Sequence, residues 1–469
     1  MDRSWSRERL TRVLGDWSCR DDGALFRQLA ERFRQLIHAG DIPNGVRIPS
    51  ERAIASALGV SRSTVVTAMD QLRDEGLIVS RQGAGTYVSR AGWHSAARGD
   101  SRLNTFLDSN PIKGLIDLRS AALPGLPMVA DEMSHLGSAD MKNLVSSHGY
   151  LPHGLPLLRE AVARYFEDFA LPTEPAEVLI TSGAQQALRL VSSAVLEPGA
   201  TVLVEEPTFR GAIETLRSIG ASLVPVASGP DGIDLAELRR LAHQTSPAMI
   251  FVQSGGNNPT GAVMSAQSRA TLARIAADVD TLVVEDAAVN DAAIDDAPLP
   301  PIHGFGARVI TIGSASKSFW GGLRVGWLRG DGDLIHHLTV VKGGEDLGTS
   351  VLAQLLTASL MPKMALARQQ RQESLCRSRE ILLELLADSL PDWEPTVPHA
   401  GASMWIRLPE GSATAFAQHA GRLGVSILAG PTFSCADRLD DHVRVAFAAR
   451  PEVIVHGLGR LSRAWREFA

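Results

Sequence analysis

Residues 313–327, GSASKSFWGGLRVGW, place Lys317 among small hydroxyl residues, with Arg324 seven positions later. The chain contains only five lysines, against 41 arginines. Arginine keeps its proton in a protein, whereas the surroundings of a lysine can convert it to a neutral amine. Because only the neutral amine attacks a carbonyl, this stretch indicates covalent chemistry at Lys317.

Further candidate residues follow apolar runs that resemble β-strands. Gly183, Ala184 and Gln185 come after one such run and begin a helical pattern, whose backbone N–H groups can hold a phosphate. Phe209 follows a second run and offers a ring that can cover a flat ligand. Taken alone, each has a simpler interpretation: many strand–helix turns contain glycine, and most phenylalanines pack in the core.

Three more candidates are polar. Asn258 precedes a proline, where an Asx turn is the simpler explanation. Asp286 ends the run TLVVED and can hold a protonated ring nitrogen or merely cap the next helix. Arg444 lies inside the β-like run DHVRVAFA, and a substrate carboxylate is one bidentate partner for an arginine in such a place.

The elements that position these residues alternate along the chain. Runs such as EVLITSG, TVLVEEP and AMIFVQSG are separated by helical patterns over 184–197, 209–219, 234–243 and 265–279. This alternation predicts a mostly parallel sheet covered by helices on both faces. Ligands of such sheets lie beyond the carboxyl ends of the strands, which is where the candidate residues stand.

The first ninety residues contain three helical patterns followed by a hairpin pattern. The first covers 24–40, the second has Ser50 as its N-cap and breaks at Gly59, and the third runs from Ser61 to Gly76. LIVS and TYVS, joined by RQGAG, then predict two short strands and a turn. The order predicts a winged helix-turn-helix.

The second helix of such a motif enters the major groove of DNA, with its N-terminal residues towards the bases. Short donors and arginines suit phosphates and guanine edges. Pattern alone also allows a helical packing module with solvated arginines. The candidate DNA-contacting residues are Arg52, Ser61, Arg62, Ser63, Thr64, Arg81 and Gln82.

Charge and composition agree with a two-part chain. Fourteen arginines, no lysine and 11 acidic residues give residues 1–90 a formal charge of +3, whereas the whole chain carries −6. A basic head favours a polyanionic partner. Residues 91–115 show no sustained period, so we expect a linker there, and 116–469 form the large domain.

Three widely spaced cysteines predict neither a disulfide framework nor a zinc site, and we expect no other metal. The charged start MDRSWSRERL lacks the apolar stretch of a signal peptide, and no apolar run approaches membrane length. We therefore expect a cytoplasmic protein without a membrane partner.

RIPSERAIASALGVSRSTVVTAMDQLRDEGLIVSRQGAGTYV resembles the DNA-binding head of GntR-type bacterial regulators. The order of candidate residues from Gly183 to Arg444 resembles that of the aminotransferases, which are fold-type I pyridoxal-phosphate enzymes. The joined chain resembles MocR-type regulators over about 20–90 and 116–465, and SASKSFWGG and DLGTSVLAQLL look closest to the YczR-like branch. The resemblance implies a winged helix-turn-helix joined to an α/β aminotransferase-like domain with a small C-terminal α+β subdomain.

The resemblance also implies roles around pyridoxal 5′-phosphate, an electron sink for amino compounds. It implies that Lys317 forms the Schiff base, that Asp286 pairs with the ring nitrogen, and that Arg444 binds an effector carboxylate. The remaining implied contacts are with the phosphate (Gly183, Ala184, Gln185, Ser314, Ser316, Arg324 and, from the neighbouring subunit of a domain-swapped homodimer, Tyr150), the ring face (Phe209) and the phenolic oxygen (Asn258).

One departure from the aminotransferase pattern bears on function. Aminotransferases carry a tyrosine two or three residues after the ring-nitrogen aspartate, whereas Ala288 and Val289 stand here. Loss of that donor should slow proton transfer. Glu285 beside Asp286 leaves a one-residue ambiguity in the assignment.

We therefore expect a transcription regulator that binds an operator in double-stranded DNA and senses a small amino compound or the cofactor itself. Two alternatives remain: an active aminotransferase with an appended DNA-binding head, and a regulator whose domain does not bind the cofactor. Steady keto-acid production would favour the first alternative.

Overall fold

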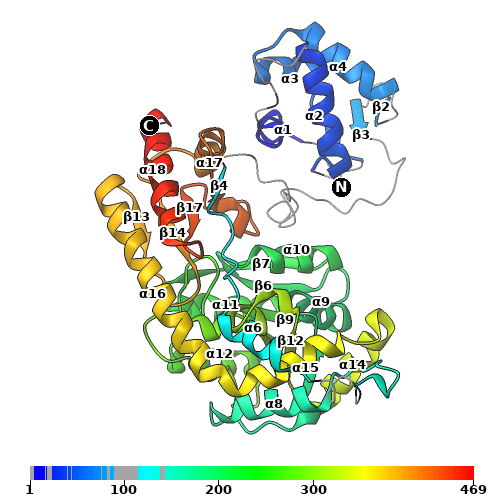
Figure 1. The fold of residues 1–469 in the computed structure, drawn as a ribbon. Coiled ribbons are helices and arrows are strands. Elements are labelled where there is room, and N and C mark those ends of the chain that lie inside the picture. Colours follow the sequence, from blue (N-terminus) through cyan, green and yellow to red (C-terminus); the bar gives the residue numbers. More distant parts are fainter. Residues whose placement is uncertain are drawn as a thin grey trace. The chain divides into compact units, whose positions relative to one another are not determined.

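The computed structural model describes residues 5–15, 17, 24–39, 41–43, 45–74, 77–81, 85–88, 115–137, 142 and 144–468. They form two compact units, here called the head and the body, within Met1–Ser109 and Asn110–Ala469 (Figure 1). Of the predicted linker over 91–115, only Leu115 is among the described residues. Gln82, in the predicted wing, lies outside them as well.

The head contains the three predicted helices and the predicted hairpin strands. Ser50 caps α3, where its Oγ accepts a hydrogen bond from the N–H of Ala53 at 3.3 Å, and Gly59 ends that helix at φ 65°, in the left-handed region that glycine adopts without strain. A further strand, β1, was not expected; it pairs antiparallel with β3. The elements are α1 (Arg7–Leu14), α2 (Leu25–Ala39), β1 (Arg47–Ile48), α3 (Glu51–Leu58), α4 (Arg62–Asp74), β2 (Ile78–Arg81) and β3 (Gly85–Val88).

An eight-stranded sheet forms the centre of the body, in the order β5-β12-β11-β10-β9-β6-β7-β8. Its pairs are parallel except for those made by β12 and by β8, so the expectation of a mostly parallel sheet is confirmed. The strands are β5 (Val178–Thr181), β6 (Thr201–Glu206), β7 (Ser222–Gly229), β8 (Gly232–Ile233), β9 (Met249–Val252), β10 (Leu282–Asp286), β11 (Val309–Ser314) and β12 (Gly326–Arg329).

Helices cover both faces of this sheet because its strands are apolar on both sides. Along β10, Val284 packs in the cluster of α9 and α10, whereas Val283 packs in the cluster of α11 and α12. This two-residue alternation decides which way every polar side chain at the strand ends points. The helices are α9 (Ala184–Val195), α10 (Arg210–Ile219), α11 (Leu235–Thr245), α12 (Ala266–Asp278) and α14 (Gly332–Asp346).

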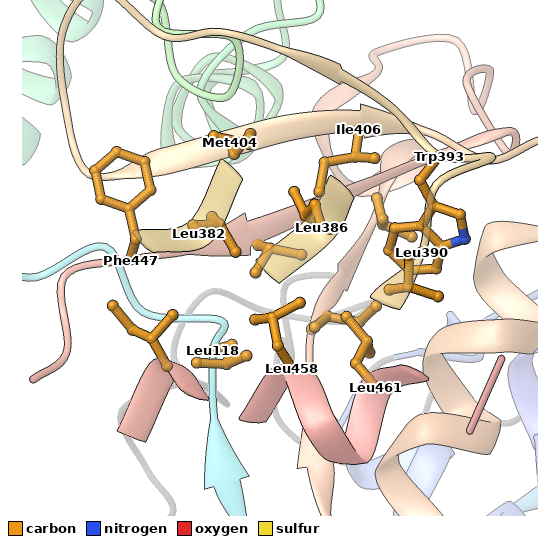
Figure 2. Close-up of a cluster of buried hydrophobic side chains, with 14 of the residues drawn as sticks. Leu118, Leu382, Leu386, Leu390, Trp393, Met404, Ile406, Phe447, Leu458 and Leu461 are labelled. Atoms are coloured by element: carbon orange, nitrogen blue, oxygen red, sulfur yellow. The ribbon is translucent and has the colours of Figure 1, made fainter. Parts of the chain in front are cut away.

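The C-terminal part of the body is a smaller layer of four antiparallel strands and three helices, as the predicted fold class requires. Figure 2 shows its core, where Leu382 and Leu386 pack with Ile406 and Leu461. The elements are α16 (Met364–Ser389), β13 (Glu394–Thr396), β14 (Ser403–Arg407), α17 (Ala413–Arg422), β16 (Leu428–Ala429), β17 (His442–Ala446) and α18 (Pro451–Phe468).

The other described body elements flank these layers. They are β4 (Ile116–Asp117), α6 (Pro127–His135), α8 (Pro156–Glu167), α13 (Ala315–Ser318), α15 (Val351–Leu360) and β15 (Val425–Ser426), together with short 3-10 turns. No helix among the described residues is long and apolar enough to cross a membrane.

Candidate functional site

Lys317 lies in the short helix α13, directly after the carboxyl end of β11. Ser314 caps this helix, because its Oγ accepts a hydrogen bond from the N–H of Ser316 at 3.2 Å. The half-buried Lys317 side chain points across the site and donates from Nζ to the carbonyl oxygen of Ala121 at 2.7 Å. The strand end thus presents an amine, as the sequence indicated.

The glycine turn before α9 lies against Arg324. Gly183 has φ 112°, and a Cβ built on it would come within 3.0 Å of Nη2 of Arg324. The same Nη2 donates to the carbonyl oxygen of Ser182 at 2.7 Å. Because β12 lies between β5 and β11, its register brings Gly326 opposite both Thr181 and Ser314. The turn, the arginine and the Ser314 cap are therefore neighbours.

Ala184 and Gln185 begin α9, as expected, but the Gln185 side chain has a structural partner. Its Nε2 donates to the carbonyl oxygen of Gly211 at 3.0 Å and so ties α9 to α10. A Cβ on Gly211 would lie 2.6 Å from both the Phe209 ring and Oε1 of Gln185. Gln185 can therefore offer a phosphate its backbone N–H, while Phe209 stands at the start of α10.

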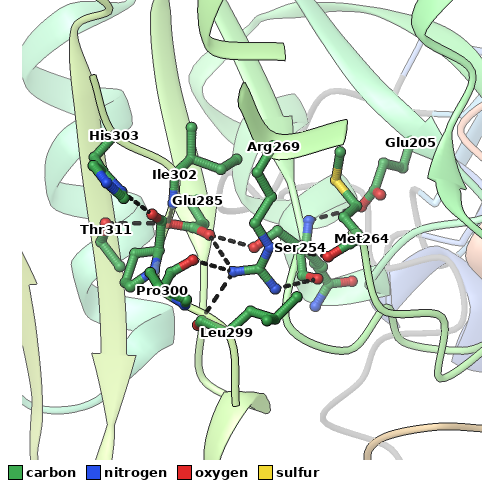
Figure 3. Close-up of polar contacts among 12 residues, drawn as sticks. Glu205, Ser254, Met264, Arg269, Glu285, Leu299, Pro300, Ile302, His303 and Thr311 are labelled. Atoms are coloured by element: carbon green, nitrogen blue, oxygen red, sulfur yellow. Dashed lines mark hydrogen bonds and ion pairs between the residues drawn. The ribbon is translucent and has the colours of Figure 1, made fainter. Parts of the chain in front are cut away.

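The structure separates the two adjacent acidic residues of β10. Glu285 is fully buried on the α12 face, where it accepts hydrogen bonds from Ser254 Oγ, Ile302 N–H and Thr311 Oγ1 and lies 3.8 Å from Arg269 (Figure 3). Asp286 points to the opposite side of the strand. Glu285 thus belongs to a structural network, and Asp286 is the candidate carboxylate of the site.

Gln253, at the end of β9, connects Asp286 with Asn258. Its Nε2 donates to Oδ2 of Asp286 at 3.5 Å, and its Oε1 accepts the N–H of Asn258 at 3.2 Å. The other carboxylate oxygen of Asp286 accepts the N–H of Ala288 at 3.0 Å. With only 2% of its surface exposed, Gln253 was missed at the sequence level because nothing about a glutamine after a strand distinguishes it.

Arg444 enters the site from β17 of the C-terminal layer. Its Nη1 donates to Oδ1 of Asn258 at 2.9 Å, its Nη2 donates to the carbonyl oxygen of Arg119, and its guanidinium stacks 4.9 Å from the Phe433 ring. These contacts show that Asn258 and Arg444, which are far apart in sequence, lie next to each other in the site.

A buried carboxylate that the sequence analysis did not consider lies beneath Gln253. Oε2 of Glu205 accepts the N–H of Gln253 at 2.8 Å and the amide of Asn257 at 3.2 Å, while Oε1 has no hydrogen-bond partner among the described residues. Burial raises the pKa of Glu205 to about 7, and the charge of Asp286 adds to this effect against the two hydrogen bonds.

Arg371 of α16 fixes the backbone around Lys317 and was also missed. Its guanidinium donates to the carbonyl oxygens of Lys317, Ser318, Phe319 and Pro124, at 2.7 to 3.2 Å. The carbonyls of Lys317, Ser318 and Phe319 lie at the C-terminal end of α13, where a short helix leaves its carbonyls without partners. Burial lowers the pKa of Arg371 to about 10. An arginine inside an otherwise helical pattern was the only available signal.

Asp291 contacts Ser318, the residue that follows Lys317 in α13. It accepts hydrogen bonds from Ser318 Oγ at 2.8 Å, Tyr165 Oη at 3.2 Å and Arg368 Nε at 2.8 Å. Tyr165 is buried, and burial raises its pKa far above the ordinary value. Tyr165 therefore supports α13. The two positions after Asp286 at which aminotransferases carry a tyrosine are occupied by Ala288 and Val289.

Tyr150, by contrast, is 61% exposed and stacks on His148 at 5.9 Å. In the head, Ser61, Arg62 and Ser63 are exposed at the start of α4, as is Arg52 on α3. Thr64 is half-buried, and nothing is described of the Arg81 side chain. Among the described residues, no group of three or more His, Cys, Asp or Glu side chains is arranged to hold a metal ion.

Two known families match separate parts of the chain. Residues 125–461 match the family described as aminotransferase class I and II, and residues 25–88 match the gntR family of bacterial regulatory proteins. The first match covers nearly all of the body, including every body residue of the candidate site, and the second covers the described helices α2 to α4 of the head.

Related proteins include both regulators and enzymes. An uncharacterized HTH-type transcriptional regulator of Bacillus subtilis, YdfD, is 27% identical over 95% of this chain and 97% of its own length. The probable rhizopine catabolism regulatory protein MocR of Rhizobium meliloti is 29% identical over 79% of each chain. The 2-aminoadipate transaminase of Thermus thermophilus is 31% identical over 68% of this chain and 80% of its own.

Solved structures similar to this one include aminotransferases. The α-aminoadipate aminotransferase LysN of Thermus thermophilus, crystallised with N-(5′-phosphopyridoxyl)-L-leucine, has a TM-score of 0.69 at 27% identity and covers 77% of this chain and 94% of its own. A kynurenine aminotransferase of Pyrococcus horikoshii, at 23% identity and a TM-score of 0.72 over 78% and 95%, has the same fold.

Proposed function

This chain belongs to the aminotransferase class I and II family and carries a gntR-family head, and from that premise we propose that it is a regulator that senses an amino compound with pyridoxal 5′-phosphate. The chain is a GntR-family regulator fused to an aminotransferase-like domain, and a head of this family implies DNA binding. The cofactor that membership of the aminotransferase family implies is pyridoxal 5′-phosphate. The MocR-type resemblance agrees with the relatives found; assignment to the YczR-like branch stays a prediction.

The observation that carries the proposal is the convergence of Lys317, Asp286 and the Gly183 turn at the strand ends. The turn and Arg324 leave a cradle that a Cβ would fill, which suits a phosphate. When bound here, the cofactor supplies an electron sink for an amino compound.

In this proposal, each residue of the chain has a defined task. Arg324, Ser314, Ser316 and the N–H groups of Gly183, Ala184 and Gln185 hold the phosphate. Phe209 covers the ring, the Asn258 amide binds its phenolic oxygen, and Asp286 keeps a proton on the ring nitrogen. Arg444 binds the carboxylate of the effector. Arg371 binds the backbone carbonyl of Lys317 and Asp291 binds the side chain of Ser318, so that together they keep Lys317 in position.

Sensing fits this site better than rapid turnover. The positions of the missing tyrosine are Ala288 and Val289, neither of which can donate a hydrogen bond from its side chain. A second candidate function, slow transamination, is favoured by the presence of Lys317, Asp286 and Arg444 together and by the 31% identity to a 2-aminoadipate transaminase.

We further propose a homodimer in the cytoplasm, in which Tyr150 contacts the phosphate bound by the partner subunit. In the single chain Tyr150 is 61% exposed, and Val145 and Leu157 near it in sequence are 78% and 48% exposed. A second copy that covers these apolar side chains would remove them from water. A second copy would complete the site.

Absorbance of the purified full chain with added pyridoxal 5′-phosphate tests the cofactor assignment. After unbound cofactor is removed, we expect a cofactor band to stay with the wild-type chain, and borohydride should fix the cofactor to the peptide that contains Lys317; in Lys317→Ala borohydride should fix nothing. Operator binding measured with and without amines then tests sensing. If the wild-type chain shows no band and borohydride fixes nothing, the body does not use the cofactor and the proposal is wrong.

A further inference from the structure

The segment that enters the body directly after the predicted linker passes between the two layers of the body. We call residues 116–126 the strap. Its first residues form β4, which pairs in parallel with β15 of the C-terminal part. The N–H groups of Ile116 and Leu118 donate to the carbonyl oxygens of Gly424 and Ser426, both at 2.9 Å.

Leu118 anchors the strap to the C-terminal layer. Its side chain is 1% exposed and lies beside Leu458 in the core (Figure 2), and its carbonyl oxygen accepts the N–H of Ala446, at the end of β17, at 2.8 Å. Arg444 is on the same strand. This end of the strap therefore moves with the layer that carries Arg444.

The other end of the strap is attached to the Lys317 region of the larger layer. Arg371 donates from Nη2 to the carbonyl oxygen of Pro124 at 2.8 Å, and the N–H of Leu126 donates to the carbonyl oxygen of Phe319 at 3.1 Å. The strap thus bridges the two layers, and its crossing is the short stretch from Arg119 to Ala121.

Two cationic residues of the proposed site, Lys317 and Arg444, hold this crossing. Lys317 donates from Nζ to the carbonyl oxygen of Ala121, and Arg444 donates from Nη2 to the carbonyl oxygen of Arg119. The strap carbonyls are therefore competitors for the same hydrogen-bond donors that a ligand needs.

A carboxylate binds an arginine best through two parallel N–H···O bonds. Arg444 can make such a pair with its two Nη atoms, which now donate to Arg119 O and Asn258 Oδ1, so a carboxylate there competes with both acceptors. The anionic acceptor is the stronger one, so it displaces the neutral carbonyl.

Displacement at Arg119 is transmitted towards the linker by Asp117. Oδ1 of Asp117 accepts both the N–H of Arg119 at 2.8 Å and its Nε at 3.0 Å, and Oδ2 accepts Nη2 at 3.2 Å. These three bonds connect the crossing with β4. Leu115, the last residue of the predicted linker, lies one residue before β4.

Resting on the proposed function, we infer that the strap reports the carboxylate of the effector: an amino compound with a carboxylate releases Arg119 from Arg444 and alters how the chain leaves the body towards the DNA-binding head. An amine without that group occupies the same place but leaves this contact intact. The inference assigns the sensed ligand to the amino acids.

Two stable probes that differ only in the carboxylate separate these cases: N-(5′-phosphopyridoxyl)-L-alanine and N-(5′-phosphopyridoxyl)ethylamine. Each is bound to the full chain, and hydrogen exchange of the strap peptide is followed by mass spectrometry. We expect the alanine conjugate, but not the ethylamine conjugate, to raise the exchange rate of the strap peptide about fivefold or more. Equal exchange with both bound conjugates would overturn the inference.

Operator affinity with the same two probes distinguishes this inference from the proposed function. In the wild type we expect about a tenfold difference between the two conjugates. Asp117→Ala, which touches neither Lys317 nor Arg444, should bind both probes as the wild type does and bring the operator affinities to within about twofold. Asp117→Asn keeps an acceptor for the Arg119 N–H and should retain most of the difference.

If both conjugates change operator affinity equally relative to the ligand-free chain, the strap inference is wrong and the proposed function stands. If neither conjugate changes the operator affinity, the proposed function itself is contradicted. An undiminished difference in Asp117→Ala again overturns the inference.

Discussion

Glu205 and Glu285 are buried carboxylates on strands of the same sheet, but their partners differ. Glu285 has three hydrogen-bond donors and Arg269 close by, whereas one oxygen of Glu205 has no hydrogen-bond partner among the described residues. Desolvation therefore dominates at Glu205, and its pKa rises to about 7. Its protonation should be visible in stability measurements.

Because the pKa of Glu205 is raised above the ordinary value of 4.5, the folded chain binds this proton more tightly than the unfolded chain. The stabilisation that this bound proton contributes is fully present below the pKa of Glu205 in the unfolded chain and is lost as pH rises through about 7. The free energy of unfolding should therefore fall by up to about 3 kcal/mol over this range. Glu205→Gln, which is isosteric and uncharged, should remove this slope and be the more stable protein at pH about 8.

Denaturant unfolding of the full chain at a series of pH values measures this effect. The exposed Glu410 offers a matched control, since Glu410→Gln should keep the wild-type slope. A slope that persists unchanged in Glu205→Gln would show that another group causes it.

We expect opposite phenotypes from substitutions at Asp286 and Glu285, the two neighbouring acids of β10. Asp286→Asn should weaken binding of pyridoxal 5′-phosphate by about tenfold to a hundredfold, because a charge-assisted hydrogen bond is lost, and should leave unfolding nearly unchanged. Glu285→Gln should lower the free energy of unfolding by about 3 kcal/mol, because Arg269 stays buried without its counterion.

Absorbance titration and denaturant unfolding on both variants check this prediction. Each variant is the control for the other, since the substitutions are chemically equivalent and adjacent. Exchange of the two phenotypes would mean that the carboxylate of the site is Glu285.

At the scale of elements, α16 links the two layers of the body. Its N-terminal half carries Arg368 and Arg371, which hold α13, whereas Leu382 and Leu386 in its C-terminal half lie in the core of the smaller layer. One helix thus supports the backbone of Lys317 and the layer of Arg444 together.

Arg371→Met should destabilise the body by about 3 kcal/mol or more, because four carbonyls in and beside α13 lose their buried donor. The same loss should loosen Lys317 and weaken cofactor binding, while Arg371→Lys, which keeps the charge and fewer donors, should show an intermediate loss. Unfolding and absorbance titration measure the two effects. Arg377→Met, an exposed position on the same helix, should resemble the wild type; if Arg371→Met does too, the carbonyl contacts contribute nothing.

At the scale of the whole molecule, the head and the body are separate compact units. The head has its own core, with Phe33, Val65 and Leu72 buried, and the candidates Arg52, Ser61, Arg62 and Ser63 are exposed at the starts of α3 and α4. Changes at those positions should therefore alter DNA binding without altering the body.

Arg62→Ala should weaken operator binding by about tenfold and reduce the slope of log affinity against log salt by about 1, if Arg62 contacts a phosphate. Cofactor absorbance and the unfolding of the body should not change. Binding measured at several salt concentrations tests this, with the exposed body residue Arg308 (Arg308→Ala) as control. An unchanged operator affinity would exclude Arg62 from the DNA interface.

The linear sequence determined the parts whose signals are local. Helical spacing, the Ser50 cap and the Gly59 stop sufficed for α2, α3 and α4 of the head, because caps and turns depend on residues within a few positions of each other, whereas α1 and β1 were not expected. The alternation of apolar runs and helices sufficed for the parallel sheet, and the order of Lys317, Asp286 and Arg444 for the family.

Only the tertiary structure decided the rest. The period of two along β10 separated Asp286 from Glu285 once it was known which helices cover each face of the sheet. Arg371, Gln253 and the strap gained their roles from groups far away in the chain, such as Pro124, 247 positions from Arg371, Asp286, 33 positions from Gln253, and Arg444, 325 positions from Arg119. Contacts between residues so far apart in the chain depend on the order of the strands in the sheet and on the packing of the helices. Neither can be predicted from residue types and short spacings.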